Sequence, residues 1–349
     1  MRTRSLSRWL LAAWLGACPL GILIHSLHAA DPAKLADVKA ADAAKPAETK
    51  PADAKPKPSV PKPPPDVDRP VPEDQLKKIE EALPTEAPAK ANKPRKLLVC
   101  TLATGFVHSS IPVGAKTFDL MGKKLGTWET VISHDKEMFA PDKLAGFDAI
   151  LMQSTTGSLF GVKGKQTPEE KEHNDMLRKS LVDFVKSGKG LIGVHAASDC
   201  SYDWPEYGEM IGGYFNGHPW GKVTYRIDDP KSPLTVMFPT DKAFELSDET
   251  YTFKPVPYSR DKLHVLASID VSKFSEADIA KENRKDDHDY ALSWIHEFGK
   301  GRVFYAAHGH SEHVYWNPVM LKHYLAGIQY ALGDLQANDA PSSSASAGK

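Results

Sequence analysis

Four short, mostly apolar runs constrain the fold of this chain more than any other feature of its sequence. They cover residues 96–102, 149–152, 190–194 and 302–306. Such runs are typical of strands that are covered on both faces, as in parallel sheets. Helices are expected to begin at Pro112 and after Thr167, which is followed by a proline and two acids. The alternation predicts an α/β fold with a doubly wound, mostly parallel sheet flanked by helices.

The N-terminus has the order of charges and apolar residues that is typical of an export signal. Three arginines within the first eight residues precede an apolar run over residues 9–24, and Ala29 and Ala30 follow. We therefore expect residues 1–30 to be a signal peptide and the protein to be exported, to the periplasm or outside the cell. An alternative is a lipobox ending at Cys18, whose lipid would tether the protein to a membrane.

The next segment is poor in large apolar side chains. Residues 31–95 are dominated by Ala, Pro, Lys and Asp, so burial cannot offset the entropy lost on ordering. We expect a disordered linker there, with residues 75–83 as its one candidate helix. Residues 336–349 are rich in Ser and Ala and are expected to form a disordered tail. One folded domain remains, over residues 96–335.

The overall charge balance excludes one class of partner. The chain has 44 Lys and Arg residues and 45 Asp and Glu residues, for a formal net charge of -1. A nucleic-acid-binding domain usually concentrates basic residues on one face. We therefore expect no nucleic-acid partner.

Polar side chains follow each of the four apolar runs. In open α/β sheets, ligands bind outside the carboxyl ends of the strands, so these side chains are expected to meet at one edge. The residues in question are His108 and Ser109, Thr155, His195 and Asp199, and His310. The sequence thus predicts a polar site for a small molecule.

Histidine suits two kinds of chemistry at such a site. In the first, His195 is a general acid and base together with Asp199 or Glu249, because imidazole titrates near neutral pH. His108 is a further catalytic candidate. In the second, the histidines hold a divalent metal such as zinc, together with one carboxylate. The predicted metal ligands are His218 and His310, with His108 and His195 as further candidates, and both mechanisms stay open.

Aromatic and hydroxyl-bearing residues near these histidines are typical of a sugar site, in which a ring stacks on the C–H face and acids bind the hydroxyls. The predicted substrate-binding residues are Ser109, Thr155, Trp204, Tyr207, Trp220, Asp248 and Tyr251. Because adjacent residues of a strand point to opposite faces, only one of Asp248 and Glu249 is expected to reach the site.

Several of these segments, taken in order, resemble motifs of the ThuA-like (trehalose utilisation) family. They are FVHSSI at 106–111, GLIGVHAASD at 190–199, GGYFNGHP at 212–219, DETY at 248–251, GKGRVFYAAHGH at 299–310 and YALG at 330–333. One departure is Ala306–Ala307–His308, so His308 is expected to be specific to this chain. The resemblance implies a class I glutamine-amidotransferase-like, flavodoxin-like sandwich and a role in the metabolism of trehalose, related disaccharides and 3-keto sugars.

The residue after the third apolar run separates this chain from amidotransferases. Those enzymes place a nucleophilic cysteine at that turn, and His195 stands there instead. Cys200 lies at the wrong offset to replace it, Cys100 is expected to pack in a strand, and a disulfide between the two is left open. We expect an enzyme acting on a disaccharide or its 3-keto derivative, not a Cys-dependent amidotransferase. The alternative is a non-catalytic sugar-binding or assembly module.

Overall fold

A computed structural model describes residues 66–161 and 166–343 of the chain. The predicted signal peptide, the lipidation candidate Cys18 and the linker up to residue 65 lie outside the described residues, as does the end of the predicted tail. Among the helices of the described ranges, none is long and apolar enough to cross a membrane.

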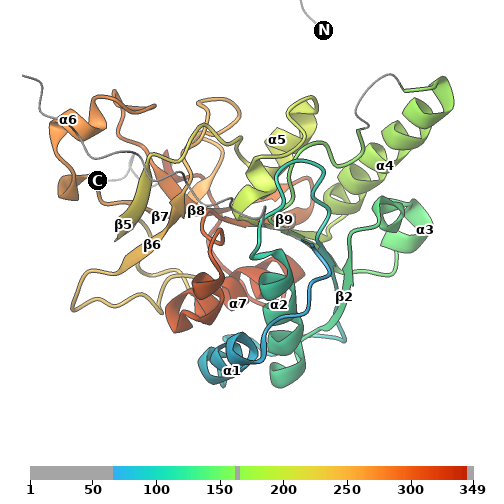
Figure 1. Cartoon of the computed structure of the whole chain (residues 1–349), viewed down its shortest axis with the longest axis horizontal. Helices are drawn as coiled ribbons and strands as arrows, with labels where there is room; N and C mark the ends of the chain where they lie inside the picture. Colours follow the sequence, from blue (N-terminus) through green and yellow to red (C-terminus); the bar gives the residue numbers. More distant parts are fainter. Residues whose placement is uncertain (1–65, 162–165, 344–349) are drawn as a thin grey trace, which may run out of the picture. The chain divides into compact units, whose positions relative to one another are not determined.

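A nine-stranded sheet organises the domain, with the strand order β2-β1-β3-β4-β9-β8-β7-β5-β6 (Figure 1). The first five strands in this order are parallel. They are β2 (Glu129–Ser133), β1 (Lys96–Cys100), β3 (Ala149–Gln153), β4 (Gly190–Val194) and β9 (Gly301–Ala306). Each of the four predicted apolar runs forms one of these strands, and the end of each strand faces the same edge of the sheet.

The other half of the sheet is antiparallel and corrects the prediction of a mostly parallel, doubly wound sheet. Four of the eight pairings, from β9 to β6, are antiparallel. The strands are β8 (Ala291–Phe298), β7 (His264–Ile269), β5 (Trp220–Ile227) and β6 (Glu245–Thr250). They are joined by loops and turns rather than by long crossover helices, which antiparallel neighbours do not require.

Helices cover both faces of the parallel half. The helices α2 (Ile111–Leu125) and α7 (Pro318–Leu332) pack on one face, and α4 (Pro168–Lys186) and α5 (Pro205–Ile211) on the other (Figure 1). Strand β1 shows the alternation that this requires. Leu97 and Val99 join the core cluster with α2 and α7, and Leu98 and Cys100 join the cluster with α4 and α5. Shorter elements are α3 (Pro141–Leu144), α6 (Glu276–Ile279) and 3-10 turns at Lys136–Phe139, His195–Ser198, Val271–Lys273 and Glu312–Trp316.

The start of α4 confirms the helix predicted there. The side chain of Thr167 accepts a hydrogen bond from the Glu170 N–H, and the Glu170 carboxylate accepts one from the Thr167 N–H. This capping box satisfies two backbone donors that a helix start leaves without partners.

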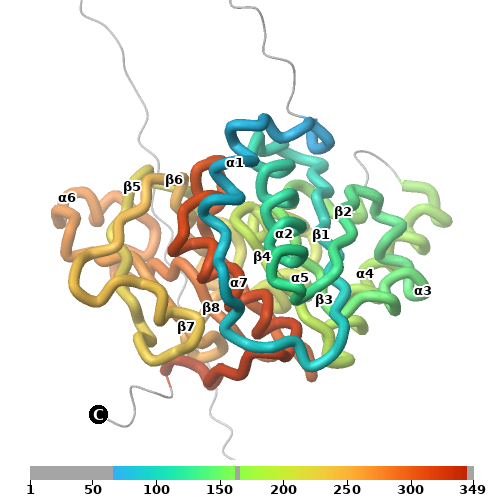
Figure 2. Tube along the Cα trace, turned by 90° about the horizontal axis from the view of Figure 1, so that it is seen from below, coloured from blue at the N-terminus to red at the C-terminus, as the bar shows by residue number. Residues whose placement is uncertain are grey.

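Residues 66–95 fold against the domain, so the predicted linker is wrong over this part. Helix α1 (Glu73–Ala82) buries Ile79 completely in the core. The chain then runs past α7 (Figure 2), where the Ala89 N–H donates to the Gln329 side chain and Arg95 pairs with Asp334. The alanine- and proline-rich composition hides these few anchoring residues. The start of the predicted tail is also ordered, since Ser342 accepts a hydrogen bond from the Val265 N–H.

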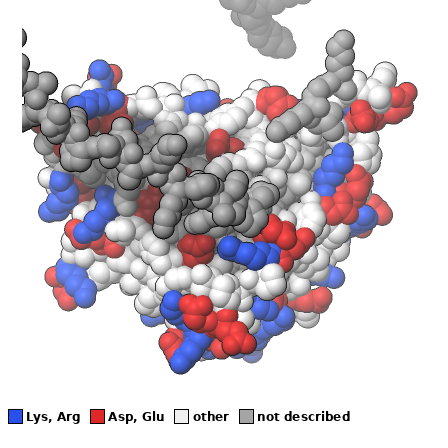
Figure 3. Space-filling view, in the orientation of Figure 1, with Lys and Arg blue, Asp and Glu red and all other residues white. Residues whose placement is uncertain are grey.

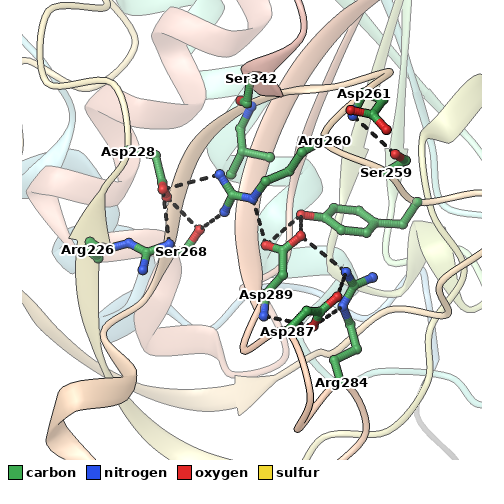
Figure 4. Close-up of polar contacts among 12 residues, drawn as sticks. Arg226, Asp228, Ser259, Arg260, Asp261, Ser268, Arg284, Asp287, Asp289 and Ser342 are labelled. Atoms are coloured by element: carbon green, nitrogen blue, oxygen red, sulfur yellow. Dashed lines mark hydrogen bonds and ion pairs between the residues drawn. The ribbon is translucent and has the colours of Figure 1, made fainter. Parts of the chain in front are cut away.

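A network of paired charges ties the antiparallel half together (Figure 4). The Arg260 guanidinium donates to Asp289 at 2.8 Å and to Ser268 at 2.7 Å, and its third nitrogen lies 3.3 Å from Asp228. Arg284 also reaches Asp289, at 3.2 Å. These pairs fix the loops before β7 and β8 to the sheet. Removing one partner would leave a partly buried charge without its counter-ion, which is destabilising.

Acidic and basic side chains are interspersed over the face shown in Figure 3, without a concentrated blue patch on the part that is visible. The expectation that the protein has no nucleic-acid partner stays a prediction.

Candidate active site

Four side chains from different parts of the chain converge at the carboxyl edge of the parallel strands. They are His108, His195, Glu249 and His310, and one ligand atom from each lies within 4.8 Å of the others. His108 follows β1, His195 follows β4 and His310 follows β9, so three of them lie where the strand-end rule predicts. We call this set the four-residue cluster.

Glu249 reaches the cluster from β6, in the antiparallel half of the sheet, whose neighbour β5 pairs with two strands. Residues of β5 from Trp220 to Thr224 pair with β6, whereas Tyr225 to Ile227 pair with β7. The pairing with β6 is irregular between Trp220 and Lys222. Strand β6 is the last strand of the sheet, and Glu249, near its C-terminal end, lies beside His195 and His310.

His195 is held with one nitrogen directed into the cluster. Its Nδ1 lies 2.8 Å from the Ala307 carbonyl oxygen, so Nδ1 carries the hydrogen and donates it. The other nitrogen, Nε2, is buried, has no hydrogen-bond partner in the part of the chain that the structure describes, and lies 3.5 Å from the Glu249 carboxylate. The backbone has a positive φ of 50°, which costs about 1–3 kcal/mol in a non-glycine residue. Tyr305 stabilises this turn by donating to the His195 carbonyl at 2.7 Å.

His108 is the second buried histidine of the cluster. Its Nδ1 has no hydrogen-bond partner within residues 66–161 and 166–343, and its ring centre lies 4.8 Å from that of His195 and 5.1 Å from that of His310. Burial, together with the two neighbouring histidines, lowers the pKa of His108 to about 3. The imidazole is therefore neutral near pH 7 and offers a lone pair.

Glu249 links the cluster to the rim of the site. Its carboxylate lies 3.1 Å from His310 Nδ1, without hydrogen-bond geometry, and 3.3 Å from His218 Nδ1. Burial alone would raise the pKa of Glu249, but contacts with His195 and His310 outweigh it and hold the pKa well below its usual range. The contact with Glu249 also raises the pKa of His310. Glu249 is thus a carboxylate that faces three imidazoles.

Asp248 and Glu249 point to opposite sides of β6, as the sequence predicts. The buried Asp248 carboxylate accepts hydrogen bonds from three successive backbone N–H groups, those of Gly309 at 2.8 Å, His310 at 3.1 Å and Ser311 at 2.9 Å. Its oxygens are therefore committed to this loop, and we assign Asp248 to the positioning of His310 rather than to substrate binding. Gly309 is required in the loop because its φ is 136° and a Cβ there would lie 2.7 Å from the Tyr315 hydroxyl.

Aromatic side chains line the pocket that gives access to the cluster. A pocket of about 230 Å³ lies over it, with Phe106, Phe215 and Tyr251 as aromatic lining. Phe106 is 64% exposed, although its ring centre lies only 4.8 Å from that of His108. The Tyr251 ring centre lies 4.3 Å from that of His195. Sequence reasoning missed Phe106 and Phe215, although both stand inside the quoted motifs.

Asp199 lines the same pocket, but its hydrogen-bond partner is the Tyr202 hydroxyl, at 2.6 Å. Burial raises the pKa of Asp199. Of the two carboxylates proposed to assist His195, Glu249 is the one that lies beside its free nitrogen. His218, half exposed, lies on the rim of the pocket and outside the four-residue cluster, whereas His310 is in it.

The other predicted substrate-binding residues lie outside the pocket. Trp204 and Tyr207 belong to the core beneath α5, and the Tyr207 hydroxyl donates to the Ala197 carbonyl. Thr155 is fully buried, and Ser109 donates to Glu312 at 2.7 Å. Trp220 lines a neighbouring groove. His308, expected to be specific to this chain, is buried. Its two ring nitrogens form hydrogen bonds with the hydroxyls of Tyr225 and Thr250, and these bonds hold the start of the loop that carries His310.

The two cysteines of the described residues are inert. Cys100 and Cys200 are both buried and unpaired. Burial raises the pKa of each thiol to about 12, so neither is a thiolate near neutral pH. This favours the expectation that the chain is not a Cys-dependent amidotransferase.

A comparison with protein-family models identifies one family. The family model for trehalose utilisation, ThuA, matches residues 96–331. A ThuA-like protein from Bacteroides uniformis is similar in structure at 20% sequence identity, with a TM-score of 0.52 over 69% of this chain and 93% of that chain. A ThuA-like protein from Parabacteroides merdae shares 13% identity, with a TM-score of 0.45 over 70% of this chain and 93% of that chain. No curated protein matches the chain.

Proposed function

Since this chain belongs to the ThuA (trehalose utilisation) family, we propose that it is an enzyme of carbohydrate metabolism that acts on a disaccharide or its 3-keto derivative with the help of a divalent metal ion. The four-residue cluster carries this proposal. Three imidazoles and one carboxylate form a donor set that suits zinc and similar ions. The alternative is a group of hydrogen-bonded polar residues, but within the described residues one nitrogen of each of the three histidines has no hydrogen-bond partner.

The free nitrogens support a metal more strongly than the composition of the set does. Buried polar atoms in folded proteins nearly always have a hydrogen-bond partner. Here the Nδ1 of His108 and the Nε2 of His195 are buried without a partner among the described residues, and both belong to the same cluster. The Ala307 carbonyl fixes the His195 ring in the tautomer that leaves Nε2 unprotonated, as carbonyl groups behind metal-binding histidines do.

The residues around the cluster have separate roles in this proposal. A bound divalent ion supplies a Lewis acid that polarises a sugar carbonyl or activates a water molecule. Asp199, with its raised pKa, and His218, on the rim, are the groups that remain to exchange a proton with the substrate. Phe106 and Tyr251 offer aromatic surface to the C–H face of a sugar ring.

Assays on reconstituted protein test this function. The protein is stripped with a chelator, reloaded with zinc, manganese or cobalt, and incubated with α,α-trehalose and its 3-keto form. We expect turnover that requires the metal and that is lost in His195→Ala. The matched control is His173→Ala, which removes a surface histidine on α4 that pairs with Glu137. Sugar binding without turnover under every metal would contradict the enzyme and favour a non-catalytic sugar-binding module.

We also propose that the protein is exported by its first 30 residues and acts outside the cytoplasm. The charge and apolar order of that segment supports this. Fractionation of cells that express the full chain tests it, and retention of an unprocessed chain in the cytoplasm would contradict it.

A further inference from the structure

A second hollow adjoins the pocket over the four-residue cluster. This groove has a volume of about 530 Å³ and shares His218 and Glu249 with the pocket. The two shared side chains lie 3.3 Å apart and form the ridge between the two hollows. A molecule that is longer than the pocket can therefore continue over this ridge into the groove.

The floor of the groove is built by β6 and by the loop that follows β9. Ser247 precedes Glu249 by two residues, so both lie on the same face of the strand, and Ser247 is exposed. His313 lies across from it, with its Nε2 donating to the Ser247 carbonyl at 2.6 Å. Trp220 closes the groove from β5, held in place by Phe274 and Tyr290, whose ring centres lie 4.8 and 4.9 Å away.

The chemistry of this lining narrows the choice of occupant. Neither lysine nor arginine lines the groove within the described residues, which disfavours a phosphate or carboxylate group. The Asp248 carboxylate already accepts hydrogen bonds from backbone N–H groups, and the Glu249 carboxylate faces histidines, so neither is available to pair with a cationic ligand in the groove. What remains is the Ser247 and Ser311 hydroxyls, the His313 ring and the edge of Trp220. These groups suit a neutral, hydroxyl-rich molecule.

We propose that this groove is a second binding subsite, which holds the second sugar unit of a substrate whose reacting ring lies over the four-residue cluster. This inference rests on the proposed function. The two sugar units would lie on opposite sides of the ridge formed by His218 and Glu249. One unit contacts the pocket, and the other contacts Ser247, Ser311 and His313.

Filling the groove tests the proposal. Ser247→Trp places a bulky ring on the exposed face of β6, where aromatic residues are well tolerated. Gly221→Leu fills it from β5, and a Cβ at Gly221 meets no other atom within 4 Å. The matched control is Glu245→Trp, which alters the same face of β6 outside the groove lining. Binding of α,α-trehalose and of methyl α-glucoside to the metal-loaded full chain is measured by calorimetry.

We expect both groove variants to weaken trehalose binding about tenfold or more, while methyl α-glucoside binding and metal content stay at wild-type values. The control should leave the binding of both sugars unchanged. Equal weakening of both sugars, or unchanged trehalose binding in both groove variants, would overturn the second subsite alone. Wild-type protein that binds metal but neither sugar would instead overturn the proposed function.

Discussion

Replacing Asp248 by asparagine probes how the loop that carries His310 is held. The buried carboxylate accepts three backbone hydrogen bonds from residues 309–311. Asparagine retains one acceptor oxygen, but its NH₂ group takes the place of the other oxygen. A donor then faces backbone N–H donors, and no hydrogen bond can form there. Hydrogen bonds to a charged group contribute roughly 1.5–3 kcal/mol each, so losing one or two should cost about 1.5–6 kcal/mol. At about 2–4 °C per kcal/mol for a domain of this size, the fall in Tm should be on the order of 3–24 °C.

The same variant should bind metal more weakly, because the loop no longer holds His310 beside Glu249. Thermal unfolding monitored by circular dichroism gives the first quantity, and calorimetric titration with zinc gives the second. Asp183→Asn, which removes an exposed carboxylate on α4 paired with Lys179, is the matched control. Wild-type Tm and wild-type zinc affinity in Asp248→Asn would refute the role of Asp248 as a positioning residue.

The effect also has a defined pH dependence. Burial alone would raise the pKa of Asp248, but His308, His195 and the Gly309 N–H outweigh burial and lower it. A carboxyl group whose pKa is lower in the folded state stabilises the fold above its unfolded pKa, and this contribution is lost as the pH falls through the folded pKa. The Tm difference between wild type and Asp248→Asn should therefore be full at pH 7 and shrink below about pH 4. A difference that grows on acidification would contradict this assignment.

Three further variants separate the site from the core. Phe106→Ala removes a side chain that is 64% exposed, so Tm should stay within about 1 °C of wild type while KM for the sugar rises and kcat changes little; an unchanged KM in steady-state kinetics would exclude a contact with the substrate. Cys200→Ser should keep full activity, because its thiol is buried and protonated, and loss of turnover in a folded variant would revive a cysteine mechanism. Trp204→Ala should lower the free energy of unfolding by about 3–5 kcal/mol through a cavity under α5, with KM unchanged in the surviving folded protein; a raised KM in a variant of normal stability would return Trp204 to the sugar site.

The parallel half of the fold could be predicted because its strands are covered on both faces. Continuous apolar runs then appear in the sequence at β1, β3, β4 and β9, and the strand-end rule places the residues that follow them at one edge. The antiparallel half was missed, although β7 and β8 are also almost entirely buried. Its strands, from β5 to β8, are separated by loops of irregular length, and nothing local in the sequence indicates that β5 divides its pairing between two neighbours.

The site residues were likewise predicted well where they follow parallel strands and less well elsewhere. His108, His195 and His310 were found because each stands at the end of a predicted strand or in the loop that follows one. Trp204 and Tyr207 were misplaced because closeness in sequence to His195 does not reveal which side of α5 faces the core. Residues 66–95 were misjudged for a different reason. The short helix expected over residues 75–83 is present as α1, but an averaged composition conceals the anchors, such as Ile79 and Arg95, that dock it and the following extended segment on the rest of the domain.

The most direct test of the central claim is the metal content of the purified full chain, measured by elemental analysis after loading with zinc and exhaustive dialysis. We predict near-stoichiometric zinc in the wild type and in His173→Ala, and its loss in His195→Ala and His310→Ala, each with a folded circular-dichroism spectrum. A folded wild-type protein that retains no zinc, manganese or cobalt, or variants of the four-residue cluster that retain as much metal as the control, would contradict the account.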